Sequence, residues 1–242
     1  MGSTSGATTG GATRRAERRA ETIAEIKSLA REQLAENGTG SLSLRGIARS
    51  MRMSPAAIFR YFDTQSALIT ALCVDAYNAQ ADAIADSLQA PGQRPPDQWR
   101  AVCRATRRWA LANPADYALT NGTPIPGYQA RPEDTGAAAG RVMASVASAY
   151  LAAITGGDAD PAATAVPALP AGPLLTAMLD GAELPDSPVP GIILNAWASI
   201  LGFISAEIFG SLRNLVPDTD ALFDAHVTTV MRGMGYTADA MR

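Results

Sequence analysis

The chain has 242 residues, with 20 Lys and Arg against 23 Asp and Glu, and a formal net charge of −3. Hydrophobic residues make up 47% and charged residues 18%, which excludes a disordered polar chain and indicates a helix-prone globular protein of one large or two small domains. Apolar runs are short, and the Gly/Ser/Thr-rich start lacks the apolar core of a signal peptide. We therefore expect a cytoplasmic protein with no membrane span.

Hydrophobic residues recur at three- and four-residue steps along most of the chain, which is typical of amphipathic helices. The pattern predicts an all-α fold, with helices over residues 15–36, 44–51, 55–62, 65–88, 97–113, 142–154, 174–179, 192–213 and 218–234.

Helix-capping residues support the predicted starts of the second, third and fifth helices. Ser43 is well placed as the N-cap of the second helix, and Ser54 precedes Pro55, which a helix tolerates at its first position. Asp97 is the N-cap candidate of the fifth helix, and Thr120 to Pro132 is expected to be a loop because Gly and Pro crowd it.

The charges are divided unevenly along the chain. Residues 1–62 hold ten basic and five acidic side chains, a net charge of +5, whereas residues 63–242 hold ten and eighteen, a net charge of −8. A basic head on an acidic body points to an anionic partner for the head.

The three short helices, the tight turn between the second and third, and the basic lead-in form a helix-turn-helix pattern. The segment from Ser41 to Phe62, SLSLRGIARSMRMSPAAIFRYF, and the following DTQSAL closely resemble the DNA-binding domain of TetR-type transcriptional regulators. The resemblance covers about Ala20 to Leu72. It implies a sequence-specific regulator that acts as a homodimer on a palindromic double-stranded DNA operator, most simply a repressor relieved by a ligand.

With this resemblance the chain divides into a flexible tail over 1–13, a helix-turn-helix domain over 14–64 and a ligand-binding and dimerisation body over 65–242, with a mobile loop at about 156–173. The residues expected at the DNA are the N-terminal arginines and the positions that match the family's contacts: Arg14, Arg15, Arg18, Arg19, Ser43, Arg45, Ser54, Pro55, Ala56, Ala57, Phe59, Arg60, Tyr61 and Gln65. Ile47, Ala48, Ile58 and Phe62 are expected to pack and fix the angle between the two helices.

Three residues of the motif depart from the family pattern. Arg52 stands where the family usually has Gly in the turn, and a left-handed arginine there would cost about 1 kcal/mol. Phe59 replaces a common tyrosine and Gln65 a common lysine. Pro55 and its two alanines can contact only thymine methyls or backbone, so we expect much of the sequence preference to come from DNA shape.

Two segments of the body, around Trp109 and Trp197, resemble the TetR subgroup with a Trp-His-Gly signature, although Leu201 replaces that histidine. The helix over 192–213 is too apolar on all sides to bury only one face. The expected dimer interface comprises Ala198, Gly202, Ser205, Ala206, Phe209, Phe223, Val227 and Val230. His226 on this seam is interpreted as a structural histidine.

A ligand pocket is expected among the large residues of the body: Trp99, Val102, Cys103, Tyr117, Met143, Val146, Tyr150, Met178 and Phe203. Each could equally be core. Their character suggests a small apolar or aromatic effector.

Three other functions fit the sequence less well. An enzyme is disfavoured because no nucleophile–base constellation, phosphate-binding loop or metal-ligand spacing occurs, and neither a cofactor nor a metal is expected. A thiol-based redox regulator would use Cys73 and Cys103, for which buried structural thiols are the preferred interpretation. An effector-free helix-turn-helix protein would have a filled body core.

Overall fold

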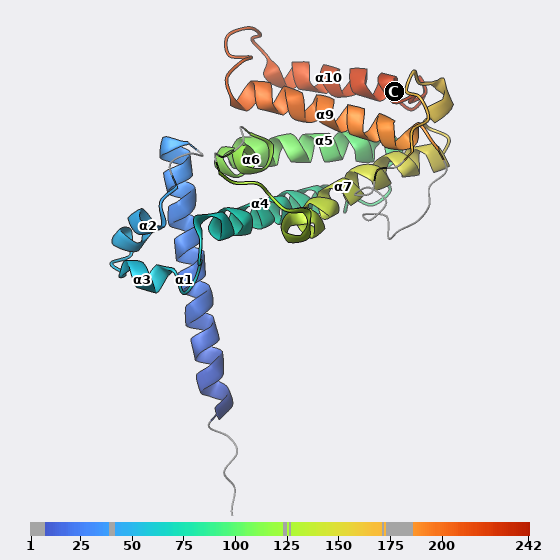
Figure 1. Ribbon diagram of the computed structural model, residues 1–242. Coiled ribbons are helices and arrows are strands. Elements are labelled where there is room, and N and C mark those ends of the chain that lie inside the picture. Colours follow the sequence, from blue (N-terminus) through green and yellow to red (C-terminus); the bar gives the residue numbers. More distant parts are fainter. Residues whose placement is uncertain (1–7, 39–41, 123–124, 126, 171, 173–185) are drawn as a thin grey trace, which may run out of the picture. The chain divides into compact units, whose positions relative to one another are not determined.

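The computed structural model describes residues 8–38, 42–122, 125, 127–170, 172 and 186–242, and over these residues it is all-α, as predicted (Figure 1). Its elements are α1 (Thr8–Asn37), α2 (Leu44–Ser50), α3 (Pro55–Ile58), α4 (Gln65–Ser87), α5 (Pro95–Ala112), α6 (Pro114–Asn121), α7 (Pro132–Thr155), the 3₁₀ turn η1 (Pro161–Ala163), α9 (Val189–Ile208) and α10 (Thr219–Gly233). The predicted helix over 174–179 lies outside the described residues.

The chain forms two compact units. One, here the head, comprises residues 1–73 and 123–130, and the other, the body, comprises residues 74–122 and 131–242. The division falls inside α4, nine residues beyond the predicted end of the helix-turn-helix domain at residue 64.

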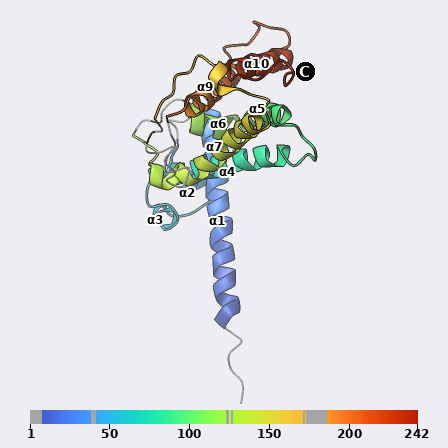
Figure 2. The same ribbon diagram turned by 90° about the vertical axis from the view of Figure 1, so that its right-hand side faces the viewer.

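Helix α1 begins at Thr8, earlier than the predicted start at residue 15 and within the tail that was expected to be flexible. Between these positions the sequence has no proline, and extending an existing helix costs far less than nucleating one. In the head, the first half of α1 extends beyond α2 and α3 (Figures 1 and 2), and it carries the first four arginines of the chain.

The head core forms where α1, α2 and α3 meet. The predicted packing residues are buried, with Ile47 and Ile58 fully enclosed and Phe62 8% exposed. They pack with α1, whose apolar stripe includes the buried Ile26 and Ala30. The angle between α2 and α3 is therefore set by a packed apolar seam, as the sequence predicted.

The turn between α2 and α3 uses Arg52 in a left-handed conformation, with φ of 54°. The Met53 N–H donates to the Ala48 carbonyl at 2.8 Å and the Arg52 N–H to the Arg49 carbonyl at 3.1 Å. This pair of bonds is the Schellman motif that ends many helices, in which glycine usually takes the left-handed position. The predicted departure from the family is thus real, and its cost is about 1 kcal/mol.

Residues 125 and 127–130 belong to the head, although the chain reaches them from the body. Ile125 is buried, and the Tyr128 hydroxyl lies 3.1 Å from the Thr70 hydroxyl and 3.9 Å from the Cys73 sulfur on α4. This segment, predicted only as loop, is therefore held to the first half of α4 by a specific side chain.

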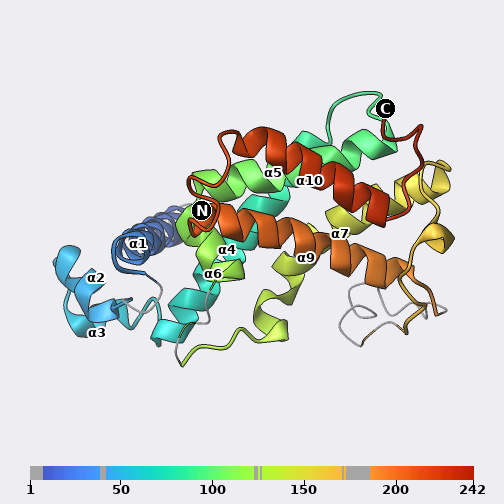
Figure 3. The same cartoon turned by 90° about the horizontal axis from the view of Figure 1, so that it is seen from above.

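In the body, α5 packs against α6, α7 and α9, while α9 and α10 run side by side (Figure 3). One face of α5 is apolar and carries Trp99, Val102 and Cys103, all fully buried. Buried tyrosines add directional bonds: the Tyr117 hydroxyl donates to the Leu201 carbonyl at 2.9 Å, and the Tyr150 hydroxyl to the Met234 carbonyl at 2.7 Å.

Several helix ends differ from the prediction, and proline explains most of them. Helices α5, α6 and α7 each begin with a proline at a first-turn position, where the missing N–H has no partner to lose. Pro114, which directly follows the predicted helix over 97–113, begins α6, a helix that was not predicted. Helix α9 ends at Ile208 instead of residue 213 because Gly210 turns the chain with φ of 84°.

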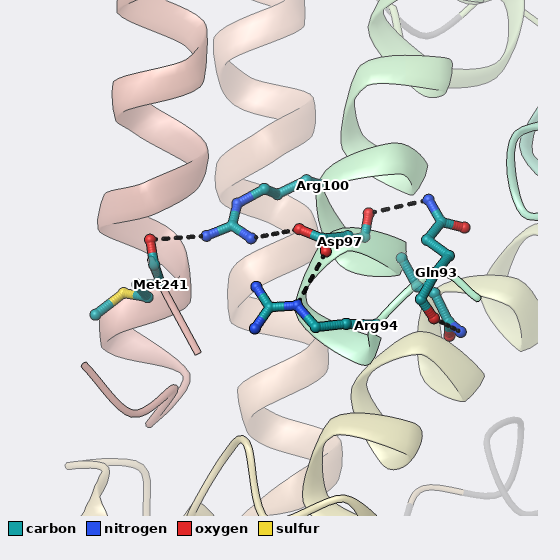
Figure 4. Close-up of polar contacts among 6 residues, drawn as sticks. Gln93, Arg94, Asp97, Arg100 and Met241 are labelled. Atoms are coloured by element: carbon teal, nitrogen blue, oxygen red, sulfur yellow. Dashed lines mark hydrogen bonds and ion pairs between the residues drawn. The ribbon is translucent and has the colours of Figure 1, made fainter. Parts of the chain in front are cut away.

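Asp97 was predicted to cap α5 but lies within its first turn. Its carboxylate accepts from Arg94 at 3.3 Å and from Arg100 at 2.9 Å, while Arg100 also donates to the Met241 carbonyl at 3.2 Å (Figure 4). A carboxylate at this position interacts favourably with the helix dipole. The same cluster ties the C-terminal residues to α5.

The segment that follows α7, expected to be a mobile loop, is pinned to the C-terminal end of the chain where it is described. Ala159 pairs with Tyr236 in an isolated β-bridge, and the Asp160 N–H donates to the Gly235 carbonyl at 2.9 Å. Gly235 has φ of 81°, and a Cβ there would collide with the Asp160 carbonyl, so this position requires glycine.

Helices α7 and α9 are each long and apolar enough, by length and composition, to cross a membrane, a property that they share with core helices of soluble proteins. Both helices pack against α5.

Arg107 joins three helices of the body. From α5 it makes a bidentate contact with Glu207 of α9, at 2.6 and 2.7 Å, and an ion pair with Asp220 of α10 at 2.7 Å. Its guanidinium also lies 4.9 Å from the Phe223 ring centre. The hydrogen bonds to Glu207 raise the pKa of Arg107 further above its usual range, so the guanidinium stays charged.

We predict that Arg107→Ala lowers the free energy of unfolding by about 3 kcal/mol, because Glu207, with a side chain only 15% exposed, would keep its charge without a partner. Arg131→Ala is the matched control, because Arg131 is 66% exposed and its ion pair with Asp134, screened by solvent, should contribute little to stability. Urea unfolding of both variants tests this, and equal losses would contradict the assigned role.

Candidate nucleic-acid interface and body cavity

The recognition element is α3 together with its flanking residues. Ser54 caps it, with its hydroxyl oxygen accepting from the Ala57 N–H at 3.2 Å, and Pro55 occupies the first helical position. Pro55 and Ala56 are exposed and Ala57 is half-buried. The start of α3 therefore presents a small, smooth surface that can approach DNA closely but offers no side-chain donor to a base edge.

Helix α2 is anchored at its start by two bonds. The Ser43 hydroxyl oxygen accepts from the Gly46 N–H at 3.1 Å, and the Ser43 N–H donates to the Gln33 side chain at 3.0 Å. The serine hydroxyl hydrogen is not used in the cap, so it is available to a phosphate oxygen.

Exposed cationic side chains surround α2 and α3. They are Arg45 and Arg49 on α2, Arg52 in the turn, Arg60 after α3, and Arg14, Arg15 and Arg18 on the projecting part of α1. Arg49 was not among the expected DNA contacts. The sequence alone does not show that Arg49 is exposed beside Arg45, because its exposure depends on how α2 packs.

Arg19, one of the expected DNA contacts, is also engaged within the head. Its guanidinium donates to the Arg60 carbonyl at 3.2 and 3.3 Å and stacks over the Tyr61 ring, 5.0 Å from the ring centre. It therefore joins α1 to the end of the recognition element and positions Tyr61.

The other expected contacts lie at the surface of the head. Phe59 is 44% exposed, which is unusual for a large aromatic side chain, so it does not belong to the core of the head. Tyr61 is half-buried under Arg19, and Gln65 is exposed at the start of α4.

The body contains a cavity of about 520 Å³. Its described lining residues are Tyr77 and Gln80 of α4, Asn121 of α6, Ala139, Val142 and Met143 of α7, Pro190, Gly191, Leu194 and Trp197 of α9, and Leu169, Pro170 and Gly172. The lining is mainly apolar, and none of these side chains is charged.

The predicted pocket residues are mostly elsewhere. Six of them are fully buried in the packed core of the body, namely Trp99, Val102, Cys103, Tyr117, Val146 and Tyr150. Phe203 packs edge-on against Phe223, and Met178 lies outside the described residues. Only Met143 among the described ones lines the cavity. The prediction chose the largest residues, which an Ala-rich body needs for its core.

Gln80 is the polar residue that the sequence analysis missed. It is 1% exposed, and its side-chain nitrogen has no hydrogen-bond partner in the structure. The sequence shows a glutamine within an Ala-rich helix, but its burial follows only from which face of α4 points inward.

Two of the residues predicted for the dimer interface, both on α10, do not lie at the surface. Phe223 and Val227 are buried in the body's own core, at 1% and 2% exposure, and so cannot face a partner. On α9, by contrast, Ala198 and Gly202 are exposed and Phe209 is 53% exposed.

The remaining expected interface residues are only partly exposed. Ser205 shares a hydrogen bond of 2.8 Å with the Tyr117 hydroxyl, while Ala206 and Val230 are half-buried. His226 stacks on Phe203 and bonds to Ser199, which agrees with the structural role expected for it.

Both cysteines are buried and unbridged, Cys73 in the head and Cys103 in the body. Burial raises the pKa of the Cys103 thiol well above its usual range, so little thiolate is present there. Within the described residues, no group of His, Cys, Asp and Glu side chains is arranged to hold a metal ion.

Each of the two units matches a known protein family. Residues 26–72 match the family model described as bacterial regulatory proteins, tetR family, and residues 99–230 match the tetracyclin repressor-like C-terminal domain. The HTH-type transcriptional regulator Rv1816 of Mycobacterium tuberculosis is 35% identical over 207 residues, which cover 84% of this chain and 87% of the relative. Mb1846 of Mycobacterium bovis, also an HTH-type transcriptional regulator, matches with the same values.

Solved structures agree with this assignment. The regulatory protein SCO4313 is 31% identical, with a TM-score of 0.69 over 89% of this chain and 98% of that one. A tetR-family regulatory protein from Rhodococcus RHA1, 19% identical with a TM-score of 0.61 over 89% and 97% of the two chains, shares the fold. With the capped recognition element, the cationic surface around it and the helical body, these matches show that the chain belongs to the TetR family of DNA-binding transcriptional regulators.

Proposed function

We propose that the protein is a cytoplasmic homodimeric repressor that binds a palindromic operator and releases it when a small molecule occupies the body cavity. The observation that carries the proposal is the lining of that cavity, which includes residues from each of the three segments that connect the body to the head.

The head supplies the DNA-binding half of the proposal. We assign base or backbone contacts to Arg45 and Arg60, phosphate contacts to Ser43 and Tyr61, and close backbone approach to Pro55. The absence of donors on the start of α3 favours operator recognition that depends on DNA shape and deformability. Arg52 and Arg49 would add phosphate contacts, which strengthen binding without selecting a sequence.

Helix α9 supports the dimer. It is the most apolar of the described helices, yet only 33% of its most apolar 18-residue stretch is buried within one chain. Leu194, Ala198, Gly202 and Phe209 are exposed along one stripe of it. An apolar stripe of this length on a regulator is best explained by a second copy, because two recognition elements must reach half-sites about 34–36 Å apart.

The connections between the units support relief by a ligand. The chain passes between head and body within α4, after α6 and before α7. Tyr77 and Gln80 on α4, Asn121 at the end of α6 and Ala139 on α7 all line the cavity. A ligand that prefers one arrangement of these helices would shift the population of head positions and so change operator affinity.

The alternatives are less well supported. A redox regulator would need an accessible, low-pKa thiol, whereas both cysteines are buried. An effector-free protein would have a filled body, whereas this body contains a cavity of about 520 Å³.

We predict that Arg45→Ala weakens operator binding by about tenfold, because one exposed cation of the helix-turn-helix is lost. Arg108→Ala is the matched control, since Arg108 is exposed on α5 of the body. Fluorescence anisotropy with operator DNA at several salt concentrations measures both, and a phosphate contact would also reduce the salt slope by about one. If the two variants bind alike, Arg45 is not at the DNA.

We predict that Gly202→Leu prevents dimerisation and weakens operator binding while the chain still folds. A Cβ at Gly202 meets nothing within 4 Å inside one chain, so the larger side chain should interfere only with a partner. Gly136→Leu on α7 is the control, because that position is equally open. Sedimentation velocity measures the state of each variant, and a dimeric Gly202→Leu protein would argue against the interface on α9.

A further inference from the structure

We propose that the effector is a neutral, largely apolar molecule with a hydrogen-bond acceptor, such as the carbonyl of a ketone, ester or lactone, and that Gln80 recognises this acceptor. The inference rests on the proposed function of the body cavity as the effector site.

The cavity has the size and lining of a small-molecule site. Its volume of about 520 Å³ lies inside the range of about 300–1,000 Å³ that is usual for such sites. Val142, Met143 and Trp197 give it an apolar wall. A ligand with a mostly hydrocarbon surface would gain by leaving water for this wall.

Gln80 is the feature that selects one chemical group. The side chain is 1% exposed and lines the cavity, and its amide nitrogen has no partner. A buried amide that donates no hydrogen bond is destabilising, so such a group normally indicates an acceptor supplied from elsewhere. A ligand carbonyl is an acceptor that fits an otherwise apolar surrounding.

Asn121 and Tyr77, which also line the cavity, each have a contact of their own. The Asn121 amide donates to the Thr120 hydroxyl at 2.9 Å. Among the described lining residues, Gln80 alone therefore contributes a buried polar atom without a partner.

The lining also selects against charge. None of the described lining residues is Asp, Glu, Lys, Arg or His. A carboxylate or ammonium would lose its hydration in this cavity and find no counter-charge, and a single neutral amide does not compensate for that loss. Long-chain carboxylates should therefore bind more weakly than neutral molecules of the same length.

The test uses the full-length protein and probes that differ by one group. Undecan-2-one and undecane form one pair, 4-phenylbutan-2-one and butylbenzene a second, and in each pair a carbonyl replaces a methylene. Undecanoate is the charged probe. Binding is followed by intrinsic tryptophan fluorescence, to which Trp197 in the cavity wall contributes, and by the rise in melting temperature that a ligand produces.

We predict that each ketone binds about fivefold more tightly than its hydrocarbon, as expected for one hydrogen bond, and that undecanoate binds most weakly. In Gln80→Leu, a substitution of similar volume, the ketone should bind no more tightly than the hydrocarbon, because its carbonyl would lose its hydration without gaining a donor. Gln98→Leu is the control, because Gln98 lies on α5 and does not line the cavity, and it should keep the preference for ketones.

Three results would overturn the inference. They are no binding of any probe, tightest binding of undecanoate, or a ketone preference that survives in Gln80→Leu. Operator release is measured separately by anisotropy. If the ketones bind through Gln80 and the operator stays bound, the ligand class stands and ligand-relieved repression fails.

Discussion

The body depends on the ion pairs of Arg107 with Glu207 and Asp220, because this largely buried guanidinium alone among the described ion pairs joins α5 to both α9 and α10. Apolar packing alone gives helices little preference for one register over another, whereas a bidentate guanidinium–carboxylate contact has a single geometry. With α9 held in this way, one of its faces is committed to the body core and an opposite stripe, which includes Ala198 and Gly202, is exposed. This exposed stripe is the face that we propose for a second chain.

The head is ordered by a different constraint, namely the orientation of a recognition element only four helical residues long. So short a helix has little stability of its own, and its direction comes from the Schellman turn at Arg52, the cap at Ser54 and the buried Ile58. Arg19 adds a contact from α1 to the end of this element. A pre-oriented surface of this kind reduces the entropy lost on binding DNA, which suits a surface with few donors to base edges.

The sequence predicted much of this structure, and physical reasons separate its successes from its failures. Periodicity and caps identified the helices and the helix-turn-helix packing, because both are determined locally. The extent of α1, the helix α6 after Pro114 and the fate of Arg19 depend on tertiary contacts. For the same reason the large residues around Trp99 were mistaken for a pocket, while the cavity lies beside Gln80. Phe223 was assigned to a partner because periodicity cannot tell which chain covers an apolar face.

Because the head is basic and the body acidic, we expect DNA to bind at the heads, symmetrically and in a salt-dependent way. This expectation is tested most directly by selecting bound fragments from a random pool of double-stranded DNA with the purified protein, and by measuring the affinity for the selected site from low to high salt. The account predicts a short palindrome whose affinity falls steeply with salt, by close to one power of the salt concentration for each phosphate contact. Enrichment of no symmetric site, or an affinity that does not respond to salt, would contradict it.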